Sequence, residues 1–237
     1  MLPVSSDAGE YAVTMRILTL SDKVEPVLYG PRLDEVVGDI DLVLGCGDLP
    51  GHYLDYVVTT LKVPCYFVHG NHAQGAEFGS CPGEQAEKRQ RCLPRGGNLD
   101  GRVVYEQELL IGGFEGSMRY NRNSFFQYTE RQMRFKVLRM APRLLWNRLR
   151  HGRYLDVLIT HAPPSGIHDG ADLCHRGFRA LLAFMRWFRP RYLIHGHKHV
   201  YRPDEITSTL YYHTEVVNTY GYRILEMQPS VAGTTPI

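Results

Sequence analysis

The segment Tyr192-Leu-Ile-His-Gly-His-Lys-His199 starts as a short apolar run and ends in a glycine flanked by histidines. A second segment of this form covers residues 65–68 and is followed by Gly70-Asn71-His72. Continuous apolar runs of this length fit strands that are covered on both faces of a sheet. Both segments therefore predict buried strands whose ends carry side chains with ligand atoms.

Three more apolar runs end in polar residues in the same way. They cover residues 16–20, 41–45 and 155–160, and they lead into Asp22, Asp48 and His161. Helical stretches lie between the runs, at residues 33–37, 52–61, 131–149 and 177–188. Strands that alternate with helices predict a layered α/β fold.

The remaining elements and the domain organisation follow from local patterns. Two pairs of β-like runs predict hairpins: residues 102–105 with 109–111, and residues 211–217 with 222–227. Residues 73–100 show no periodicity and predict a surface loop or a short irregular insertion. Since no repeat or linker interrupts the chain, we expect a single domain over residues 15–237 after an N-terminal extension of residues 1–14.

The composition narrows the class of protein. With 237 residues, 43% hydrophobic and 22% charged, the chain is expected to be a soluble globular protein and not a disordered or collagen-like one. No apolar run approaches the roughly 18 to 20 residues of a membrane-spanning helix, and the first 14 residues lack the pattern of a secretory signal. The five scattered cysteines predict reduced thiols, so a cytoplasmic location is expected.

The net charge of +2 hides a strongly basic stretch, because residues 131–153 hold eight Lys or Arg and no acid. This stretch predicts a helix that is broken near Pro142. Its expected apolar face consists of Phe135, Leu138, Leu144, Leu145, Trp146 and Leu149. Two interpretations stay open: a solvated basic surface, or a positive rim that attracts a polyanionic substrate.

The polar residues that end the strands are of one chemical kind. Sites in α/β sheets form just beyond the carboxyl ends of strands. There this sequence places Asp22, Asp48, Asn71, His72, His161, His197 and His199. Hard oxygen and imidazole nitrogen atoms suit Mn²⁺, iron, Zn²⁺ or Mg²⁺. Because five strand ends would not converge on such residues by chance, the set predicts a metal site.

These motifs resemble the calcineurin-like metallophosphoesterase superfamily. The family pattern of Asp-x-His, Gly-Asp, Gly-Asn-His, a lone His and Gly-His-x-His is matched in order over residues 16–199, apart from one position. The resemblance implies a four-layer α/β/β/α sandwich around two divalent metal ions. It also implies a role for each residue: Asp48 bridges both metals, Asp22 and His199 bind the first, Asn71, His161 and His197 bind the second, and His72 is the catalytic histidine.

One position departs from the family pattern. Where the family has Asp-x-His, this sequence reads Asp22-Lys23-Val24, and a valine side chain cannot coordinate a metal. Three interpretations stay open. The first metal binds weakly with water at the missing ligand position; or Glu25 substitutes as a ligand, or the Lys23 ammonium acts as a substitute cation; or the site is mononuclear or inactive.

The resemblance implies a metal-dependent phosphoesterase that hydrolyses a phosphomonoester or phosphodiester through a metal-activated water. Two cations about 4 Å apart can be held by a shared carboxylate, and both neutralise charge on the phosphoryl oxygens. Arg119 and His168 are further candidates for substrate contact. Two alternatives are a catalytically impaired, single-metal protein that binds a phosphorylated ligand or partner, and a nuclease that uses the basic stretch. The expected partner is a small phosphorylated substrate, with nucleic acid less favoured, and the oligomeric state stays open.

Overall fold

The computed structural model describes residues 14–72, 96–122 and 124–228. Residues 1–13 of the expected N-terminal extension, residues 73–95 of the expected loop, and Cys81 and Cys92 lie outside these ranges. The other three cysteines, Cys46, Cys65 and Cys174, are free thiols.

Two large β-sheets form the centre of the structure. The first has the strand order β13-β1-β2-β3-β4, which are Gly221–Met227, Met15–Ser21, Leu42–Gly45, Cys65–Phe67 and Gly96–Asn98. The second has the order β11-β12-β10-β9-β6-β5, which are Ser208–Tyr211, Thr214–Asn218, Tyr192–His195, Val157–Thr160, Leu109–Phe114 and Val103–Glu106. Strands β1 to β4 run parallel, as do β12, β10, β9 and β6. The carboxyl ends of the parallel strands therefore share one edge of each sheet.

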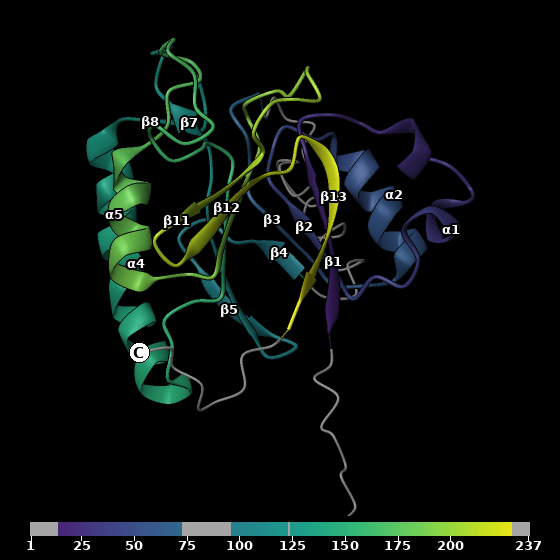
Figure 1. The fold of residues 1–237 in the computed structure, drawn as a ribbon, viewed down its shortest axis with the longest axis horizontal. Helices are drawn as coiled ribbons and strands as arrows, with labels where there is room; N and C mark the ends of the chain where they lie inside the picture. Colours follow the sequence, from purple (N-terminus) through teal and green to yellow (C-terminus); the bar gives the residue numbers. More distant parts are fainter. Residues whose placement is uncertain (1–13, 73–95, 123, 229–237) are drawn as a thin grey trace, which may run out of the picture.

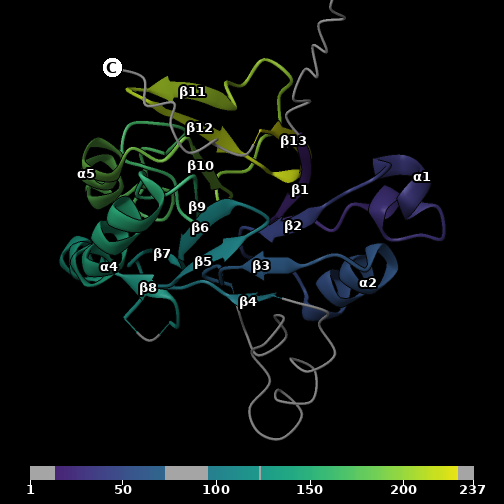
Figure 2. The same ribbon diagram turned by 90° about the horizontal axis from the view of Figure 1, so that it is seen from below.

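Helices cover the outer face of each sheet (Figure 1 and Figure 2). The five-stranded sheet packs against α1 (Leu33–Val37) and α2 (Gly51–Leu61), beside the short 3-10 helix η1 (Pro26–Leu28). The six-stranded sheet packs against α4 (Glu130–His151) and α5 (Arg179–Phe188). A small third sheet pairs β7 (Ser117–Met118) with β8 (Gln127–Tyr128).

Three apolar clusters hold these layers together. One lies between α1, α2 and the first sheet, and another lies between α4, α5 and the second sheet. The third joins the inner faces of the two sheets and includes Ile17, Leu44, Ile111, Ile159 and Ile194. The order of layers is therefore α/β/β/α, which confirms the predicted four-layer sandwich.

The five strands that lead into the predicted ligands are confirmed, each to within two residues at either end. The first predicted hairpin is also confirmed, since β5 and β6 pair antiparallel. The second is wrong: β12 pairs with β10 and β11, whereas β13 pairs with β1 in the other sheet. The edge of β1 offers β13 seven register partners, and the chain crosses between the sheets at Thr219 and Tyr220 to reach them.

The predicted break at Pro142 is wrong, because α4 continues through this residue. The whole helix is 22 residues long. A proline inside a helix removes one N–H group and crowds the carbonyl four residues earlier, which here belongs to Leu138. Both residues are exposed, so water can reach that carbonyl. A capping box formed by Thr129 and Gln132 also stabilises the helix start.

The predicted apolar face of α4 is wrong as well. Of its six members only Leu144 is buried, and the other five are exposed: Phe135, Leu138, Leu145, Trp146 and Leu149. The side that packs on the second sheet and α5 carries Met133, Val137, Met140 and Leu144. This helix thus has two apolar stripes, and the structure buries the one with regular i, i+4, i+7, i+11 spacing. Within the described ranges, no helix has the length and apolar character needed to cross a bilayer.

Candidate metal centre

The carboxyl ends of strands from both sheets bring the predicted ligands together. Asp22, Asp48 and Asn71 lie within a few residues of the ends of β1, β2 and β3 of the first sheet. His161 and His197 follow β9 and β10 of the second sheet. These side chains are buried or nearly buried. The site therefore lies where the two sheets meet, and neither sheet could build it alone.

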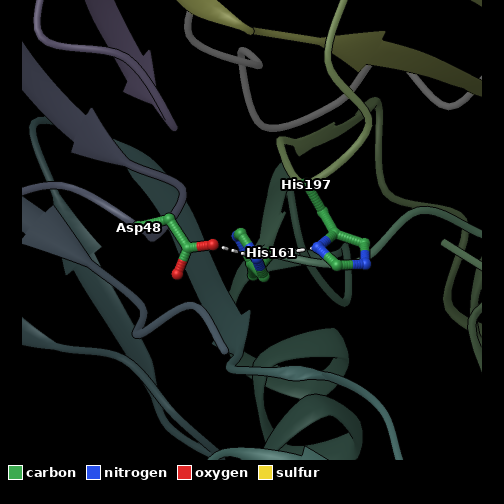
Figure 3. A group of neighbouring side chains, drawn as sticks. All are labelled: Asp48, His161 and His197. Atoms are coloured by element: carbon green, nitrogen blue, oxygen red, sulfur yellow. Dashed lines mark hydrogen bonds and ion pairs between the residues drawn. The ribbon is translucent and has the colours of Figure 1, made fainter. Parts of the chain in front are cut away.

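His161 stands at the centre of the second predicted metal position. Its Nε2 atom lies 3.2 Å from Asp48 Oδ2, 3.0 Å from Asn71 Oδ1 and 3.1 Å from His197 Nδ1. Figure 3 shows Asp48, His161 and His197 with their ring and carboxylate atoms directed at one another. Four electron-rich atoms from four chain segments thus converge on one small volume.

This convergence fits a divalent cation. A single hydrogen on His161 Nε2 cannot serve a carboxylate oxygen, an amide oxygen and an imidazole nitrogen at once. A cation of the kind that takes oxygen and imidazole ligands would be bound by all four atoms together. The donor set has the chemistry of a metal site, and its burial excludes the water that would otherwise solvate these groups.

Backbone carbonyl groups fix the orientation of both imidazoles. His161 Nδ1 lies 2.8 Å from the Cys46 carbonyl oxygen, and His197 Nε2 lies 2.7 Å from that of Cys174. A carbonyl oxygen only accepts, so each of these nitrogens carries the proton. His161 Nε2 and His197 Nδ1 are consequently the atoms with a lone pair available to a metal.

The ionisation of the cluster supports the same interpretation. Burial lowers the pKa of His161, but the Asp48 carboxylate beside it raises the value to about 9. Burial raises the pKa of Asp48, yet the nearby His161 charge holds it well below its ordinary value. Burial and the His161 charge lower the pKa of His197 to about 3. Without a metal, the His161 imidazole therefore carries an extra proton beside the Asp48 carboxylate. A metal would compete with that proton for His161 Nε2.

Glycines in the motifs allow the backbone to approach the ligands. A Cβ atom on Gly70 would lie 2.0 Å from Asp48 Oδ1, and one on Gly196 would lie 2.3 Å from Asp22 Oδ2. Gly47 has φ +91°, and a Cβ atom there would lie 2.6 Å from His161 Nδ1. No larger residue fits these positions without displacing a ligand.

Strained backbone conformations occur at three of the predicted ligands, in the turns that follow β1, β2 and β10. Asp22, Asp48 and His197 adopt φ values of 64°, 56° and 65°, in the left-handed region that residues with a Cβ atom rarely adopt. Such conformations cost of order 1–3 kcal/mol each and persist where the surroundings enforce them. Here the strain turns each side chain towards the centre as soon as its strand ends.

The first predicted metal position is less complete. Asp22 Oδ2 accepts hydrogen bonds from Ser21 Oγ at 2.5 Å and from the His197 backbone N–H at 2.8 Å. Asp22 Oδ1 is buried, has no hydrogen-bond partner and lies 3.7 Å from His199 Nε2. The other nitrogen of His199 lies 2.8 Å from the Tyr201 hydroxyl. An unpartnered carboxylate oxygen facing an imidazole nitrogen is suited to a cation, which would lie between them.

The family model of the calcineurin-like phosphoesterases matches residues 8–201 of this sequence. The chain belongs to the calcineurin-like phosphoesterase family. A crystal structure of TT1561 from Thermus thermophilus is similar over 92% of this chain and 100% of its own, with a TM-score of 0.60 at 10% identity. GAP50, described as the anchor in the inner membrane complex of Plasmodium, is similar over 91% of this chain and 81% of its own, with a TM-score of 0.51 at 8% identity. These likenesses concern the fold alone, and no curated protein matched the chain.

The departure at Val24 from the calcineurin-like pattern has a clear structural setting. Val24 packs against the apolar cluster between the first sheet and its helices. Lys23 Nζ and Glu25 Oε1 form an ion pair of 2.8 Å with each other. The two substitutes considered, Glu25 as a ligand and the Lys23 ammonium as a cation, are therefore engaged in a contact with each other.

The other sequence candidates lie at different distances from the centre. The His72 side chain is exposed, and its backbone N–H donates to Asp48 Oδ1 at 2.8 Å, which places it at the mouth of the site. The Arg119 guanidinium donates to the Gln127 carbonyl and the Gln132 side chain. His168 contacts His195 Nε2 at 3.0 Å and the Thr209 hydroxyl at 2.9 Å. The structure does not bring Arg119 or His168 into the ligand cluster, and their contact with substrate stays a prediction.

Tyr120 is a site residue that the sequence does not reveal. Asn71 Nδ2 donates to its hydroxyl at 3.1 Å, and this contact turns the amide oxygen of Asn71 towards His161. The only sequence signal was its place in the glycine-containing stretch after β6. The loop after His161 contributes too, since Cys174 orients His197 and the His175 ring lies 5.2 Å from the His197 ring.

Proposed function

We propose that this protein is a metal-dependent phosphoesterase that hydrolyses a phosphomonoester or phosphodiester by attack of water. The observation that carries the proposal is the convergence of Asp48, Asn71, His161 and His197 around His161 Nε2. Membership of the calcineurin-like family supports the reaction class. A small phosphorylated molecule is the proposed substrate.

The ligand sets follow from the contacts. Asn71, His161, His197 and Asp48 would hold the second metal, and Asp22 and His199 would hold the first together with Asp48. When bound, two divalent cations activate a water molecule and neutralise charge on the phosphoryl oxygens. Manganese is the ion we propose for the first trials, because carboxylate, amide and imidazole ligands all suit it.

The chain's own residues have distinct tasks. The Cys46 and Cys174 carbonyls keep the ligand nitrogens of His161 and His197 directed at the centre. Asp48 Oδ1 holds the backbone of His72 at the rim. From there the exposed His72 imidazole can donate a proton to the leaving oxygen as the phosphorus–oxygen bond breaks. No nucleophilic side chain is needed for this reaction.

A catalytically impaired protein that binds one metal and a phosphorylated ligand is the second candidate. The observation that favours it is that partly buried Val24 packs against an apolar cluster, because this leaves the proposed first position with three protein ligands. The buried, unpartnered Asp22 Oδ1 favours the two-metal enzyme instead.

Metal content and hydrolysis measured on the same preparation decide between these candidates. The protein is loaded with Mn²⁺, its metal is quantified by elemental analysis, and it is assayed with p-nitrophenyl phosphate and bis-p-nitrophenyl phosphate. Two metals with turnover support the phosphoesterase. One metal without turnover supports the binding protein.

His72 provides a matched test of mechanism. His72→Ala should leave the metal content intact and should reduce turnover most for substrates with poor leaving groups, by roughly 10²-fold or more. His52→Ala, an exposed histidine of α2, is the control and should change neither quantity. An equal loss on good and poor leaving groups would show that His72 is not the proton donor.

The location that we propose is the cytoplasm. The free thiols of Cys46, Cys65 and Cys174 support a reducing compartment. Labelling with a thiol reagent after denaturation of freshly extracted protein tests this, since oxidised cysteines would not react.

A further inference from the structure

The outer face of α4 exposes a row of large apolar side chains. The exposed fractions are 60% for Phe135, 59% for Leu138, 54% for Leu145, 55% for Trp146 and 82% for Leu149. These residues stand at positions i, i+3, i+10, i+11 and i+14, which is one face of a helix. The opposite face, with Met133, Val137, Met140 and Leu144, is buried against the second sheet and α5.

Arginines border this apolar row. At 100° per residue, Arg139, Arg143 and Arg150 fall on one side of the row and Arg134 and Arg148 fall on the other. All five are exposed. Residues 131–153 hold no acid at all, and Glu130 at the start of the helix is already paired with Arg134 at 3.3 Å.

Helix α4 lies with α5 on the outside of the molecule, as the outermost layer beyond the second sheet (Figure 1 and Figure 2). Its 22 residues form one continuous helix of about 33 Å. A continuous helix in the outermost layer carries its outer row on one side of the molecule.

The charge and composition of this face indicate which kind of partner it binds. A second copy of the chain, docked face to face, would place arginines against arginines, so self-association is disfavoured. Nucleic acid would use the arginines but would leave Leu138, Leu145 and Leu149 without apolar partners. A helix with arginines beside Trp, Phe and Leu is the composition that lies in the interface of a bilayer, where apolar side chains enter and cations contact anionic lipids.

We propose that the outer face of α4 docks the protein on anionic phospholipid bilayers as a peripheral protein. The apolar row of Phe135, Leu138, Leu145, Trp146 and Leu149 enters the headgroup region, while the flanking arginines contact lipid phosphates. Only the surface of the bilayer is involved, and the fold stays intact. The inference uses neither the metals nor the catalytic activity.

Trp146 and Trp187 are the two tryptophans of the chain, which makes the docking visible by fluorescence. Trp187→Phe leaves Trp146 as the reporter. The full-length protein is mixed with vesicles of phosphatidylcholine, with and without roughly one third phosphatidylglycerol. We expect a blue shift of Trp146 emission and sedimentation of the protein with the anionic vesicles. The affinity for these vesicles, measured by either method, should fall at least tenfold when NaCl rises from about 50 to about 500 mM.

Variants separate the two parts of the surface. Leu138→Ser with Leu149→Ser should lower the affinity for anionic vesicles at least about tenfold, because two apolar side chains no longer enter the bilayer. Arg139→Gln with Arg143→Gln and Arg150→Gln should lower it on the order of a hundredfold. Val27→Ser, at an exposed valine of η1, is the control and should bind as the wild type does. An unchanged melting temperature shows that each variant is folded.

Several results would overturn the proposal. These are no binding to anionic vesicles at low salt, equal binding to neutral vesicles, or full binding by the Leu138→Ser, Leu149→Ser variant. Salt-sensitive binding to single-stranded DNA without vesicle binding would assign the arginines to nucleic acid. A dimer in sedimentation equilibrium that the leucine substitutions dissociate would assign the face to a second copy.

Discussion

Replacing Gly70 by alanine should damage the metal centre far more than the fold. A Cβ atom at this position would lie 2.0 Å from Asp48 Oδ1, 2.5 Å from Asp48 Cγ and 2.6 Å from the Asp48 backbone nitrogen. An ordinary contact begins at 3.4 Å, so the carboxylate oxygen must move by about 1.4 Å. The backbone nitrogen is also too close, so a change of side-chain rotamer alone cannot relieve the clash.

The displacement is large on the scale of metal coordination. Ligand distances in metal sites are kept to about 0.2 Å, and a misplacement of about 1 Å at a reacting centre can cost roughly 10²-fold in rate. Because Asp48 is proposed to contact both metals, we expect Gly70→Ala to lose at least one metal per chain. We also expect kcat/KM to fall by 10²-fold or more, which is about 2.7 kcal/mol.

Gly30→Ala is the matched control. A Cβ atom on Gly30 would meet nothing closer than the Pro26 carbonyl oxygen at 3.9 Å, and its φ is not in the left-handed region. This substitution should leave metal content and turnover unchanged. The assays are elemental analysis after Mn²⁺ loading, hydrolysis of bis-p-nitrophenyl phosphate, and thermal unfolding, in which overpacking should cost Gly70→Ala about 1–3 kcal/mol. If Gly70→Ala keeps both its metal content and a kcat/KM within threefold of wild type, the proposed role of Asp48 is refuted.

Tyr120→Phe should weaken the second metal position by about tenfold, since the Asn71 amide loses the acceptor that orients it; Mn²⁺ titration measures this, and unchanged affinity would contradict it. Asp22→Asn should leave one metal per chain by elemental analysis, because Asp22 belongs to the first position only, and two retained metals would reject that assignment. Burial raises the pKa of Glu115, but hydrogen bonds, that of His69 first, lower it to about 2 from an ordinary 4.5. The Glu115 carboxylate therefore stabilises the fold above pH 4.5, and this contribution is lost as the pH falls towards 2. Urea unfolding between pH 4.5 and 2 should show that the free energy of unfolding falls with pH in the wild type and falls less in Glu115→Gln. An equal dependence on pH in both proteins would contradict this role of Glu115.

The ligand positions could be predicted because their signal is local. Each ligand follows a continuous apolar run, and parallel strands direct their carboxyl ends to the same edge. The structure explains the glycines that precede two of these ligands, since Gly70 and Gly196 permit close backbone contacts with Asp48 and Asp22. The local patterns therefore predicted the five strands that lead into the ligands and the residues that end them, whereas the order of the four layers was implied by the family resemblance. Strand β4, which lies inside the expected loop of residues 73–100, was not predicted.

Features that depend on packing between distant segments could not be predicted. Tyr120 reaches Asn71 only because its segment is tied to Gln127, whose side chain accepts from the Tyr120 backbone N–H at 3.2 Å. Strand β13 has the same local pattern whether it pairs with β12 or with β1, and the free edge of β1 decides the outcome. In α4, both apolar rows have helical spacing, so the sequence alone cannot tell which one the second sheet covers.

We expect Val24 to weaken the proposed first metal position without abolishing it. The proposed second position would have four ligand atoms with both imidazoles fixed by carbonyls, whereas the proposed first position would rely on Asp22, Asp48 and a His199 side chain that is 40% exposed. Burial raises the pKa of Asp22, and its Oδ1 atom has no hydrogen-bond partner. A buried carboxylate in this state is costly unless a cation neutralises it. A protein that bound one metal only would gain stability by losing this carboxylate, so its presence opposite His199 favours a weak first metal position over an absent one.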